Sequence, residues 1–401
     1  MHTSPLAQPG TGYAGGMNVY IHELSQTMAD RNVEVAVFTR RTHDDQPEVI
    51  HHRPGYRVVH IDAGPRRKLR VESLPHHVAE FADGVIRWMR DDPMPWKVIH
   101  SHYWLSGWSG VLVKEAMGAR LINSFHTLGR VMDRTRRPDE PPVPPIRTLT
   151  EDEVLARSDA IVAATPHEVD DLRNHYGADG SRIHISPPGV DHIVFGPGDR
   201  SAARRWLGLG SEPLLLFAGR IQAHKGIDIA IRALAKLPER LVVGSGRPHL
   251  LIVGGPSGRR GEAELRFLNQ LVGEHGLGER VHFVSAQPHT SLAHFYRAAD
   301  VLVMPSRSES FGLVAAEAQA CGLPVVAADI GGLRYVIDNG NSGSLVRHLE
   351  PADFAEAVAA ILDDEPTRAR LAVGAVANAE KFSWRSAARR LLELYDEPPR
   401  G

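Results

Sequence analysis

The sequence predicts an α/β protein with two doubly wound, Rossmann-like domains that face each other across a cleft. Short apolar runs alternate with helical patterns in both halves of the 401-residue chain, which is typical of parallel sheets wrapped by helices. One hydrophobic core stops growing at roughly 250 to 300 residues, so this length favours two domains. Pro and Gly cluster in SPPGVDHIVFGPGD, residues 186–199, and mark the boundary between the halves.

The expected strands are runs rich in Val, Ile or Leu without strict alternation, as in strands buried on both faces. Ligands of such sheets bind beyond the carboxyl ends of the strands, so the following loops are the candidate binding segments. In chain order the strands are expected at 33–39, 56–62, 97–103, 120–126, 159–165, 182–188, 214–220, 249–255, 280–286, 300–306 and 324–330, with helices at 227–237 and 311–320. The Pro-rich, basic segment 134–145 predicts a mobile surface loop.

The composition excludes several classes of protein. The 46 basic and 48 acidic side chains give a formal charge of -2, so no overall field attracts nucleic acid. No run approaches the roughly 18 to 20 apolar residues of a membrane span, and MHTSPLAQPG lacks the basic start and apolar middle of a signal peptide. The single cysteine, Cys321, excludes an intrachain disulfide, and no cluster has the spacing of a zinc site. We therefore expect a cytoplasmic protein.

Three interpretations fit the glycine loop GTGYAGG at residues 10–16, which follows Pro9. A nicotinamide dinucleotide site needs a preceding strand and an acidic residue after the next strand; both are absent, although Arg40 and Arg41 could suit the 2′-phosphate of NADP. A tight turn that lets a helix pack is the second interpretation. The third, which we favour, is that Gly15 and Gly16 let a pyrophosphate approach the positive N-terminus of the following helix.

Two cations follow the first strand of the second half, in FAGRIQAHKG. Arg220 lies just past the strand and Lys225 opens a helix, so both could neutralise the charge that grows on a departing diphosphate. The alternative is a pair of solvated loop residues, because charged loop residues are usually exposed.

Two acids seven residues apart lie in SESFGLVAAEAQACG, residues 308–322. Glu309 precedes a helix whose first turn, Ser310–Leu313, offers free N–H groups to a sugar or phosphate, and Glu317 could chelate a ribose diol. Serine capping and a solvated Glu317 are the alternatives. However, the apolar neighbours of Glu317 indicate that this acid has a partner.

Polar side chains also end two strands of the first half, in IHSHYWLSG and SFHTLGR. His, Tyr and Thr at strand ends over the cleft are candidate ligands of an acceptor substrate. For His100 and His126, a hydrogen-bonded core histidine remains the alternative.

Taken together, these motifs resemble the retaining glycosyltransferases of family 4 with the GT-B fold, and most closely the inositol-phosphate N-acetylglucosaminyltransferases that begin mycothiol biosynthesis. The resemblance rests on HTSPLAQPGTG, GGMNVY, HSHYWLSG, FHT, GR…KG, ESFGLVAAEAQA and FSW. It implies a hexosyltransferase that moves GlcNAc from UDP-GlcNAc to an inositol phosphate, with retention and with the leaving phosphate as base. It also implies an acceptor domain over residues 1–193, a donor domain over 194–381, and a C-terminal helix, about 382–401, that packs back on the first domain.

The resemblance implies roles for individual residues. The catalytic positions are His126, Arg220, Lys225 and Glu309. The donor-binding positions are Gln8, Pro9, Gly16, Arg220, Lys225, Glu309, Ser310, Phe311, Gly312, Leu313 and Glu317. The acceptor-binding positions are His2, Asn18, Tyr103, Thr127 and Arg147. No resident cofactor or metal site is implied, while Mg²⁺ with the UDP-sugar and a homodimer stay open.

Three features depart from the family pattern. The family has a buried strand before HTSP, whereas this sequence begins at Met1, so we expect the first strand to be missing. Tyr13 replaces an Asp, and Val71 replaces a Lys that meets the acceptor phosphate, although Lys68 and Arg70 lie nearby. The alternatives are therefore a different acceptor, either a sugar phosphate or a phosphatidylinositol-type lipid reached through the basic patch at residues 66–70, an NADP oxidoreductase, and a UDP-sugar binding protein or epimerase.

Overall fold

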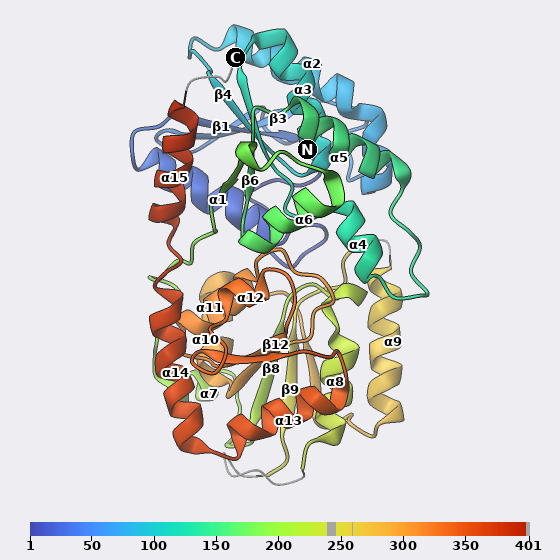
Figure 1. The fold of residues 1–401 in the computed structure, drawn as a ribbon, viewed down its shortest axis with the longest axis vertical. Helices are drawn as coiled ribbons and strands as arrows, with labels where there is room; N and C mark the ends of the chain where they lie inside the picture. The colour runs from blue at the N-terminus through green and yellow to red at the C-terminus, as the bar shows by residue number, and fades with distance from the viewer. Residues whose placement is uncertain (239–245, 259, 398–401) are drawn as a thin grey trace.

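The computed structural model describes residues 1–238, 246–258 and 260–397. It has two α/β lobes stacked along the long axis of the molecule, with the first half of the chain in one lobe and most of the second half in the other (Figure 1). Every expected strand segment contains a strand, and helices alternate with the strands along the chain. The predicted fold class is thus confirmed.

The second lobe is built on a six-stranded sheet in the order β10-β9-β8-β11-β12-β13, and all of its described pairs are parallel. The central strands β8 and β11 are completely buried, as expected where helices cover both faces. The strands are β8 (Leu214–Ala218), β9 (His249–Val253), β10 (Val281–Val284), β11 (Val301–Met304), β12 (Val325–Ala328) and β13 (Gly343–Val346). The helices are α7 (Arg200–Trp206), η3 (Ala223–Lys225), α8 (Ile227–Lys236), α9 (Gly261–Glu274), α10 (His289–Ala298), α11 (Leu313–Ala320), α12 (Leu333–Val336), α13 (Pro351–Leu362) and α14 (Glu365–Ala379).

The described part of the first lobe contains two sheets, with the strand orders β1-β3-β2 and β4-β5-β6-β7. No described strand joins β1 to β4, and only β2 runs antiparallel to its neighbour. The strands are β1 (Val35–Arg40), β2 (Val49–Arg53), β3 (Tyr56–Ile61), β4 (Val98–His102), β5 (Arg120–Ser124), β6 (Ala160–Ala163) and β7 (Ile183–Ile185). The helices are α1 (Gly16–Ala29), η1 (Val71–His77), α2 (Val78–Asp91), α3 (Trp104–Met117), α4 (Gly129–Thr135), α5 (Pro145–Arg157), α6 (Pro166–Tyr176) and η2 (Gly180–Arg182).

Two strands were not predicted, and both lie at a sheet edge. β2 reads VIHHR, with two exposed histidines, and β13 reads GSLV. An edge strand has one strand neighbour and needs less apolar sequence than a central strand, so neither segment stands out as an apolar run.

The chain crosses between the lobes at two adjacent places. Val190, on the first crossing, donates its N–H to the carbonyl of Phe382, on the second crossing, at 3.2 Å. A Cβ added to Gly189 would lie only 2.0 Å from the backbone nitrogen of Trp384. The two crossings are therefore in direct backbone contact, which only glycine permits at position 189.

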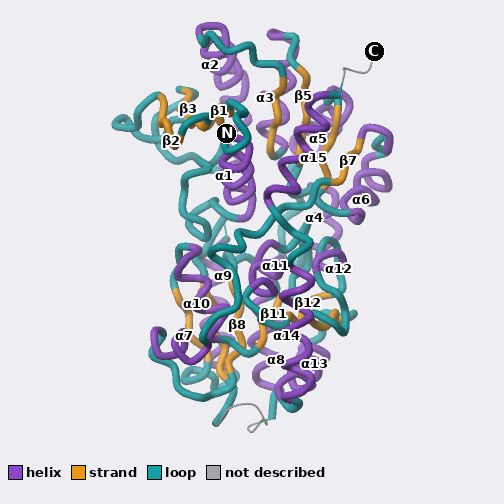
Figure 2. The backbone as a smooth tube through the Cα atoms, turned by 90° about the vertical axis from the view of Figure 1, so that its left-hand side faces the viewer, coloured by secondary structure: helices purple, strands orange, loops and turns teal. Residues whose placement is uncertain are grey.

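After the second crossing, α15 (Trp384–Asp396) returns to the first lobe. Figure 1 and Figure 2 show α15 in the first lobe and α14 in the second, and Figure 1 shows α15 beside α1. Its buried residues Trp384, Leu391 and Leu394 form one apolar cluster with residues of α1 such as Val19 and Leu24. The final residues of the expected helix, 398–401, lie outside the described residues.

Candidate active site

A cavity of about 630 Å³ lies between the two lobes. Loops that follow parallel strands of both lobes form its walls, together with the start of α1 and the segment before α11. This is the position that the strand order predicts for a ligand site. Of the residues expected in the site, those that line the cavity are His2, Pro9, Gly16, Asn18, Tyr103, His126, Thr127, Arg147, Arg220, Lys225, Glu309, Ser310, Phe311, Leu313 and Glu317.

Gln8 and Gly312 do not line the cavity. Gln8 is exposed, and its Nε2 donates to the carbonyl of Ala286 in the other lobe at 3.2 Å. Gly312 has a φ of 103° and turns the chain into α11, where a Cβ would lie 2.8 Å from the side chain of Leu333. The expected helix at 311–320 therefore begins at Leu313, because the residue before it adopts a left-handed conformation that favours glycine.

The glycine loop lets the two lobes approach each other closely. A Cβ on Gly15 would lie 3.0 Å from Nε of Arg220, and a Cβ on Gly16 would lie 3.3 Å from Cδ1 of Leu313. No strand precedes this loop in the described residues, so the arrangement differs from a dinucleotide-binding unit. The start of α1, which carries partial positive charge, instead faces a guanidinium from the other lobe.

Asn18 holds the N-terminal segment against α1. Its Oδ1 accepts the N–H of Gly15 at 3.0 Å, and its Nδ2 donates to Oγ1 of Thr3 and to the carbonyl of Ser4. Asn18 is almost completely buried. It therefore shapes the cavity wall through these contacts, in addition to lining it.

The second lobe contributes two cations and two acids. Burial lowers the pKa of Arg220, while Lys225 pairs with Oε2 of Glu309 at 2.6 Å. Glu317 accepts a hydrogen bond from the hydroxyl of Tyr296 at 2.9 Å, and burial raises the pKa of Glu317. The expectation that Glu317 needs a partner is confirmed by this contact. This wall of the cavity thus presents a buried guanidinium, a lysine–glutamate ion pair and a hydrogen-bonded carboxylate.

The opposite wall is built by the first lobe around Arg147. Its Nη2 donates to the carbonyl oxygen of Thr127 at 2.9 Å and to Oγ1 of the same residue at 3.0 Å. Its guanidinium lies over the ring of Tyr103, 5.1 Å from the ring centroid, and the ring of His2 lies 4.9 Å from that of Tyr103. Four of the expected acceptor-binding residues are therefore in one contact network.

His126 lines the cavity from a backbone position with a left-handed conformation. Its φ is 60°, which is uncommon for a residue other than glycine. Its Nε2 lies 3.0 Å from Nδ1 of His102, and its carbonyl accepts a hydrogen bond from the hydroxyl of Ser310 in the other lobe. Burial lowers the pKa of His126 to about 4, so the ring is neutral at pH 7.

His100 has a different environment from His126. It does not line the cavity, and its ring nitrogens contact the hydroxyls of Tyr395 at 2.6 Å and Ser124 at 2.9 Å. Burial lowers the pKa of His100 to about 3. His100 is therefore a hydrogen-bonded core histidine that connects β4 to α15.

The Pro-rich segment forms part of the cavity wall and contacts both lobes. The sequence predicted a mobile surface loop at 134–145 and gave no sign of these contacts. Residues 136–144, hereafter the strap, connect α4 to α5 and reach α9 in the other lobe (Figure 1). Arg137 makes a two-point ion pair with the buried carboxylate of Glu264, at 2.8 and 3.2 Å. Arg260, which directly precedes α9, also donates to the carbonyl of Asp139 at 2.9 Å.

Several cavity residues had no signal in the sequence. The buried polar atoms Tyr20 Oη, Ser186 Oγ, Gln222 Oε1 and Ser306 Oγ line the cavity without a hydrogen-bond partner in the described residues. Glu168 also lines the cavity, and one of its oxygens accepts the N–H of Ala164 at 2.8 Å. These are single polar residues in ordinary contexts, so only the fold reveals that they face a common space.

The positions that depart from the family pattern also lie at the cavity. Tyr13 and Val71 both line it, together with Glu72. The neighbouring Lys68 and Arg70 are exposed. Lys68 and Arg70 themselves are therefore not in the cavity wall, although their neighbour Val71 is.

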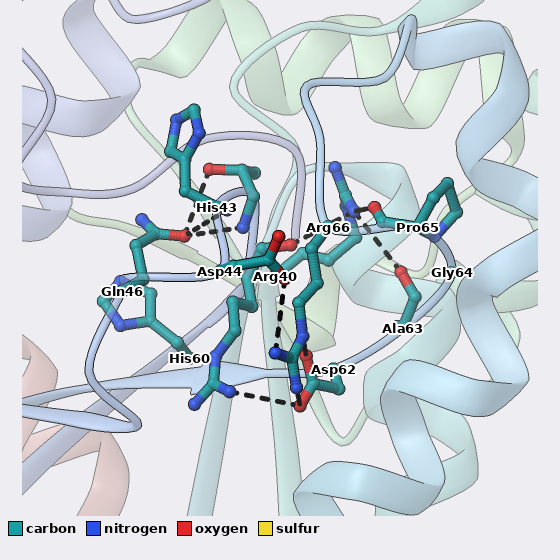
Figure 3. A network of polar contacts seen from close by, with 12 residues as sticks. Arg40, His43, Asp44, Gln46, His60, Asp62, Ala63, Gly64, Pro65 and Arg66 are labelled. Atoms are coloured by element: carbon teal, nitrogen blue, oxygen red, sulfur yellow. Dashed lines mark hydrogen bonds and ion pairs between the residues drawn. The ribbon is translucent and has the colours of Figure 1, made fainter.

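The basic patch at residues 66–70 is partly neutralised by acids of its own lobe. Figure 3 shows Arg40 donating to the carbonyls of Ala63 and Pro65, at 3.4 and 2.7 Å, which fixes the loop that carries the patch. Arg66 pairs with Asp62 at 2.8 Å and with Asp44 at 3.4 Å. Among the described helices, none has the length and apolar character to cross a membrane.

Metal ligands do not converge anywhere in the part of the chain that the structure describes. No group of three or more His, Cys, Asp or Glu side chains there has a geometry suited to a metal ion. The histidines His100, His102 and His126 instead make the ring contacts given above.

Comparison with protein families yields two matches that together span most of the chain. Residues 15–189 match the model described as glycosyl transferase 4-like domain. Residues 199–376 match the model described as glycosyl transferases group 1. The gap between the matches coincides with the first crossing between the lobes.

Two related proteins match this chain in sequence over nearly their whole length. It is 45% identical to the D-inositol 3-phosphate glycosyltransferase of Xylanimonas cellulosilytica, covering 98% of this chain and 94% of that protein. It is 44% identical to the enzyme of the same name from Stackebrandtia nassauensis, covering 99% and 90%.

Solved structures are similar over nearly the same length. Sucrose-phosphate synthase from Thermosynechococcus elongatus superposes with a TM-score of 0.91, at 32% identity, over 98% of this chain and 96% of that one. HepE from Anabaena, solved with UDP and glucose, superposes with a TM-score of 0.77 at 20% identity, over 97% of both chains, and therefore supports the fold alone.

Replacing Glu168 by Gln is expected to change the pH dependence of stability. Burial raises the pKa of Glu168 to about 7 from 4.5, so the folded protein binds this proton more tightly than the unfolded chain. The resulting stabilisation is present below pH 4.5 and is lost as the pH rises to 7. The unfolding free energies of Glu168→Gln and wild type are measured by urea unfolding at pH 4.5 and at pH 7.5. Between these two pH values, the difference between the two proteins should shift by roughly 2 to 3 kcal/mol in favour of the variant. An equal difference at both pH values would contradict this interpretation.

Reversing the charge of Arg137 is expected to open the cleft. Losing one partner of a buried ion pair costs roughly 3 to 5 kcal/mol, and in Arg137→Glu two acids face each other. X-ray scattering should show a larger radius of gyration for Arg137→Glu and for Glu264→Arg, and a return toward the wild-type value in the double variant. Arg157→Glu, which changes an exposed arginine of α5, is the control. Wild-type dimensions in both single variants would show that the pair does not hold the lobes together.

Proposed function

Because the chain belongs to the group 1 glycosyltransferases and has the GT-B fold, we propose that it transfers GlcNAc from UDP-GlcNAc to an inositol phosphate, with retention of configuration. The observation that carries the proposal is the meeting of Arg220 and Lys225 with the start of α1 in one cavity, opposite the wall built around Arg147. Cations and a helix N-terminus suit the donor diphosphate. The opposite wall suits a small polar acceptor.

The donor half is assigned by its chemistry. We assign the diphosphate to Gly16, Arg220 and Lys225, and the ribose to Glu317, whose carboxylate remains at the cavity although Tyr296 contacts one oxygen. Glu309 and residues 310–313 would hold the transferred sugar. The name of the HepE structure includes UDP and glucose, and the shared fold is compatible with a UDP-sugar in the same cleft.

The acceptor half is assigned to Arg147, Thr127, Tyr103 and His2, with Asn18 shaping the adjoining wall. These residues offer hydroxyl and guanidinium donors to ring hydroxyls and phosphate oxygens. The curated relatives are named for D-inositol 3-phosphate, which supports a phosphorylated polyol. With Val71 at the cavity, Lys68 or Arg70 would complete the phosphate contacts from the rim.

In the proposed reaction, the acceptor hydroxyl oxygen forms a bond with the anomeric carbon while the bond from that carbon to the diphosphate breaks. The hydroxyl proton passes to the leaving phosphate oxygen, so UDP carries away the electron pair and no enzyme nucleophile is needed. Arg220 and Lys225 would stabilise the growing negative charge. The neutral ring of His126, with a pKa of about 4, acts as a polar neighbour of the sugar and not as an acid.

A sugar phosphate is the second candidate acceptor. The similarity to sucrose-phosphate synthase, at 32% identity over 98% of the chain, favours this alternative. It would use the same donor chemistry and differ only in the wall around Arg147.

An acceptor panel tests the proposal. The purified chain is given UDP-GlcNAc or UDP-glucose with D-inositol 3-phosphate, free inositol or fructose 6-phosphate, and products are identified by mass spectrometry and NMR. We expect the largest kcat/KM for UDP-GlcNAc with inositol phosphate and an axial anomeric product. A preference for fructose 6-phosphate would select the second candidate, and absence of transfer to every acceptor would refute both.

Variants of the donor-side cations provide a further test. Arg220→Ala and Lys225→Ala are expected to lower kcat by about 10²- to 10³-fold, because each removes a group that stabilises the leaving diphosphate. Lys236→Ala, at the exposed end of α8, is the matched control and should retain wild-type rates. Thermal unfolding of each variant checks that the fold is intact; a folded Arg220→Ala enzyme with normal kcat would remove Arg220 from its assigned role.

A further inference from the structure

Behind the wall around Arg147 lies a carboxylate that the proposed chemistry does not use. Glu151, on α5, is completely buried and is not among the residues that line the cavity. Its oxygens accept hydrogen bonds from Nε of Arg147 at 2.8 Å and from the hydroxyl of Tyr176 at 2.5 Å. They also accept the N–H of Gly129, at 3.0 and 3.1 Å.

This carboxylate fixes the direction of the guanidinium. Arg147 and Glu151 are four residues apart on α5, so their side chains lie on the same face of the helix. Because a guanidinium is planar, holding Nε from behind determines where both terminal nitrogens point. Those nitrogens contact Thr127 and approach the hydroxyl of Tyr103 at 3.4 Å, on the cavity side.

The same carboxylate also fixes the loop that carries Thr127. It binds the N–H of Gly129, the first residue of α4, two residues after Thr127. A Cβ on Gly129 would lie 2.9 Å from Oε2 of Glu151, so glycine is what allows the carboxylate to reach the backbone. Arg147 and Thr127 are therefore both anchored to one buried group.

Charge compensation gives Glu151 a second effect. Arg147 is nearly buried, and a buried cation without a partner is strongly unfavourable. Because Glu151 lies beside Arg147, the two side chains together add little net charge to the wall around Arg147. The wall then recognises an acceptor through the direction of its hydrogen bonds more than through its overall charge.

From these contacts we propose that Glu151 is a positioning residue of the acceptor subsite, which orients Arg147 and Thr127 toward the acceptor without touching it. This inference rests on the proposed function, because it takes the wall around Arg147 as the acceptor side. It assigns acceptor recognition to a residue outside the cavity.

Steady-state kinetics with both substrates varied test the inference. In Glu151→Gln we expect the KM for inositol phosphate to rise about tenfold or more, since charge-assisted hydrogen bonds are lost or weakened, while the KM for UDP-GlcNAc stays within twofold. Tyr176→Phe keeps both charges and should raise the acceptor KM by about two- to fivefold. Asp152→Asn, which neutralises the neighbouring acid of α5 that pairs with Arg130 at the surface, is the matched control and should leave both constants unchanged.

The outcomes separate the inference from the proposed function. Wild-type protein that transfers no sugar to inositol phosphate refutes the proposed function itself. With an active wild type, an unchanged acceptor KM in Glu151→Gln overturns the inference, as does an equal rise in the KM of both substrates, which indicates a general loss of structure. If Glu151→Gln does not fold, Tyr176→Phe decides: a selective rise in the acceptor KM supports the inference, and no change overturns it.

Discussion

The close approach of positive groups from the two lobes is the constraint on which the rest of the structure depends. The guanidinium of Arg220 lies against Gly15, at the start of α1, and the N-terminus of a helix carries partial positive charge. Such groups repel one another in a partly dry site unless an anion lies between them. Three features bring these groups together: the glycines at 15 and 16, the loop after β8, and the arrangement of the chain in two lobes.

The two sides of the cavity achieve recognition in different ways. On the side that we propose for the donor, the ion pair among the described lining residues is that of Glu309 with Lys225. On the side that we propose for the acceptor, the neutral His126 and Arg147, which is paired with Glu151, offer directed hydrogen bonds with little net charge. The wall that holds Arg220 and the start of α1 would therefore attract an anionic diphosphate more strongly than the opposite wall does.

The sequence predicted the parts of the structure that have a local cause. Buried strands appear as apolar runs, Arg220 and Lys225 follow such a run, and the apolar helix around Glu317 indicated that the acid has a partner. The start of α11 was missed because it depends on the backbone of Gly312. The ion pair between Arg137 and Glu264 joins residues 127 positions apart, and the contacts of Glu151 join three separate segments, so neither leaves a pattern in the sequence. The acceptor residues were assigned from family resemblance, since hydroxyls and single histidines carry little signal alone.

The paired crossings between the lobes have a mechanical consequence. Gly189 and Trp384 are in backbone contact. The two crossing segments therefore touch at one point and cannot slide past each other. A body held at one such point rotates about an axis through it, while shear and separation are resisted by both covalent chains. When the two lobes rotate about this axis, the displacement is largest on the opposite side, where the strap meets α9. Any motion that separates the strap from α9 must break the ion pair between Arg137 and Glu264.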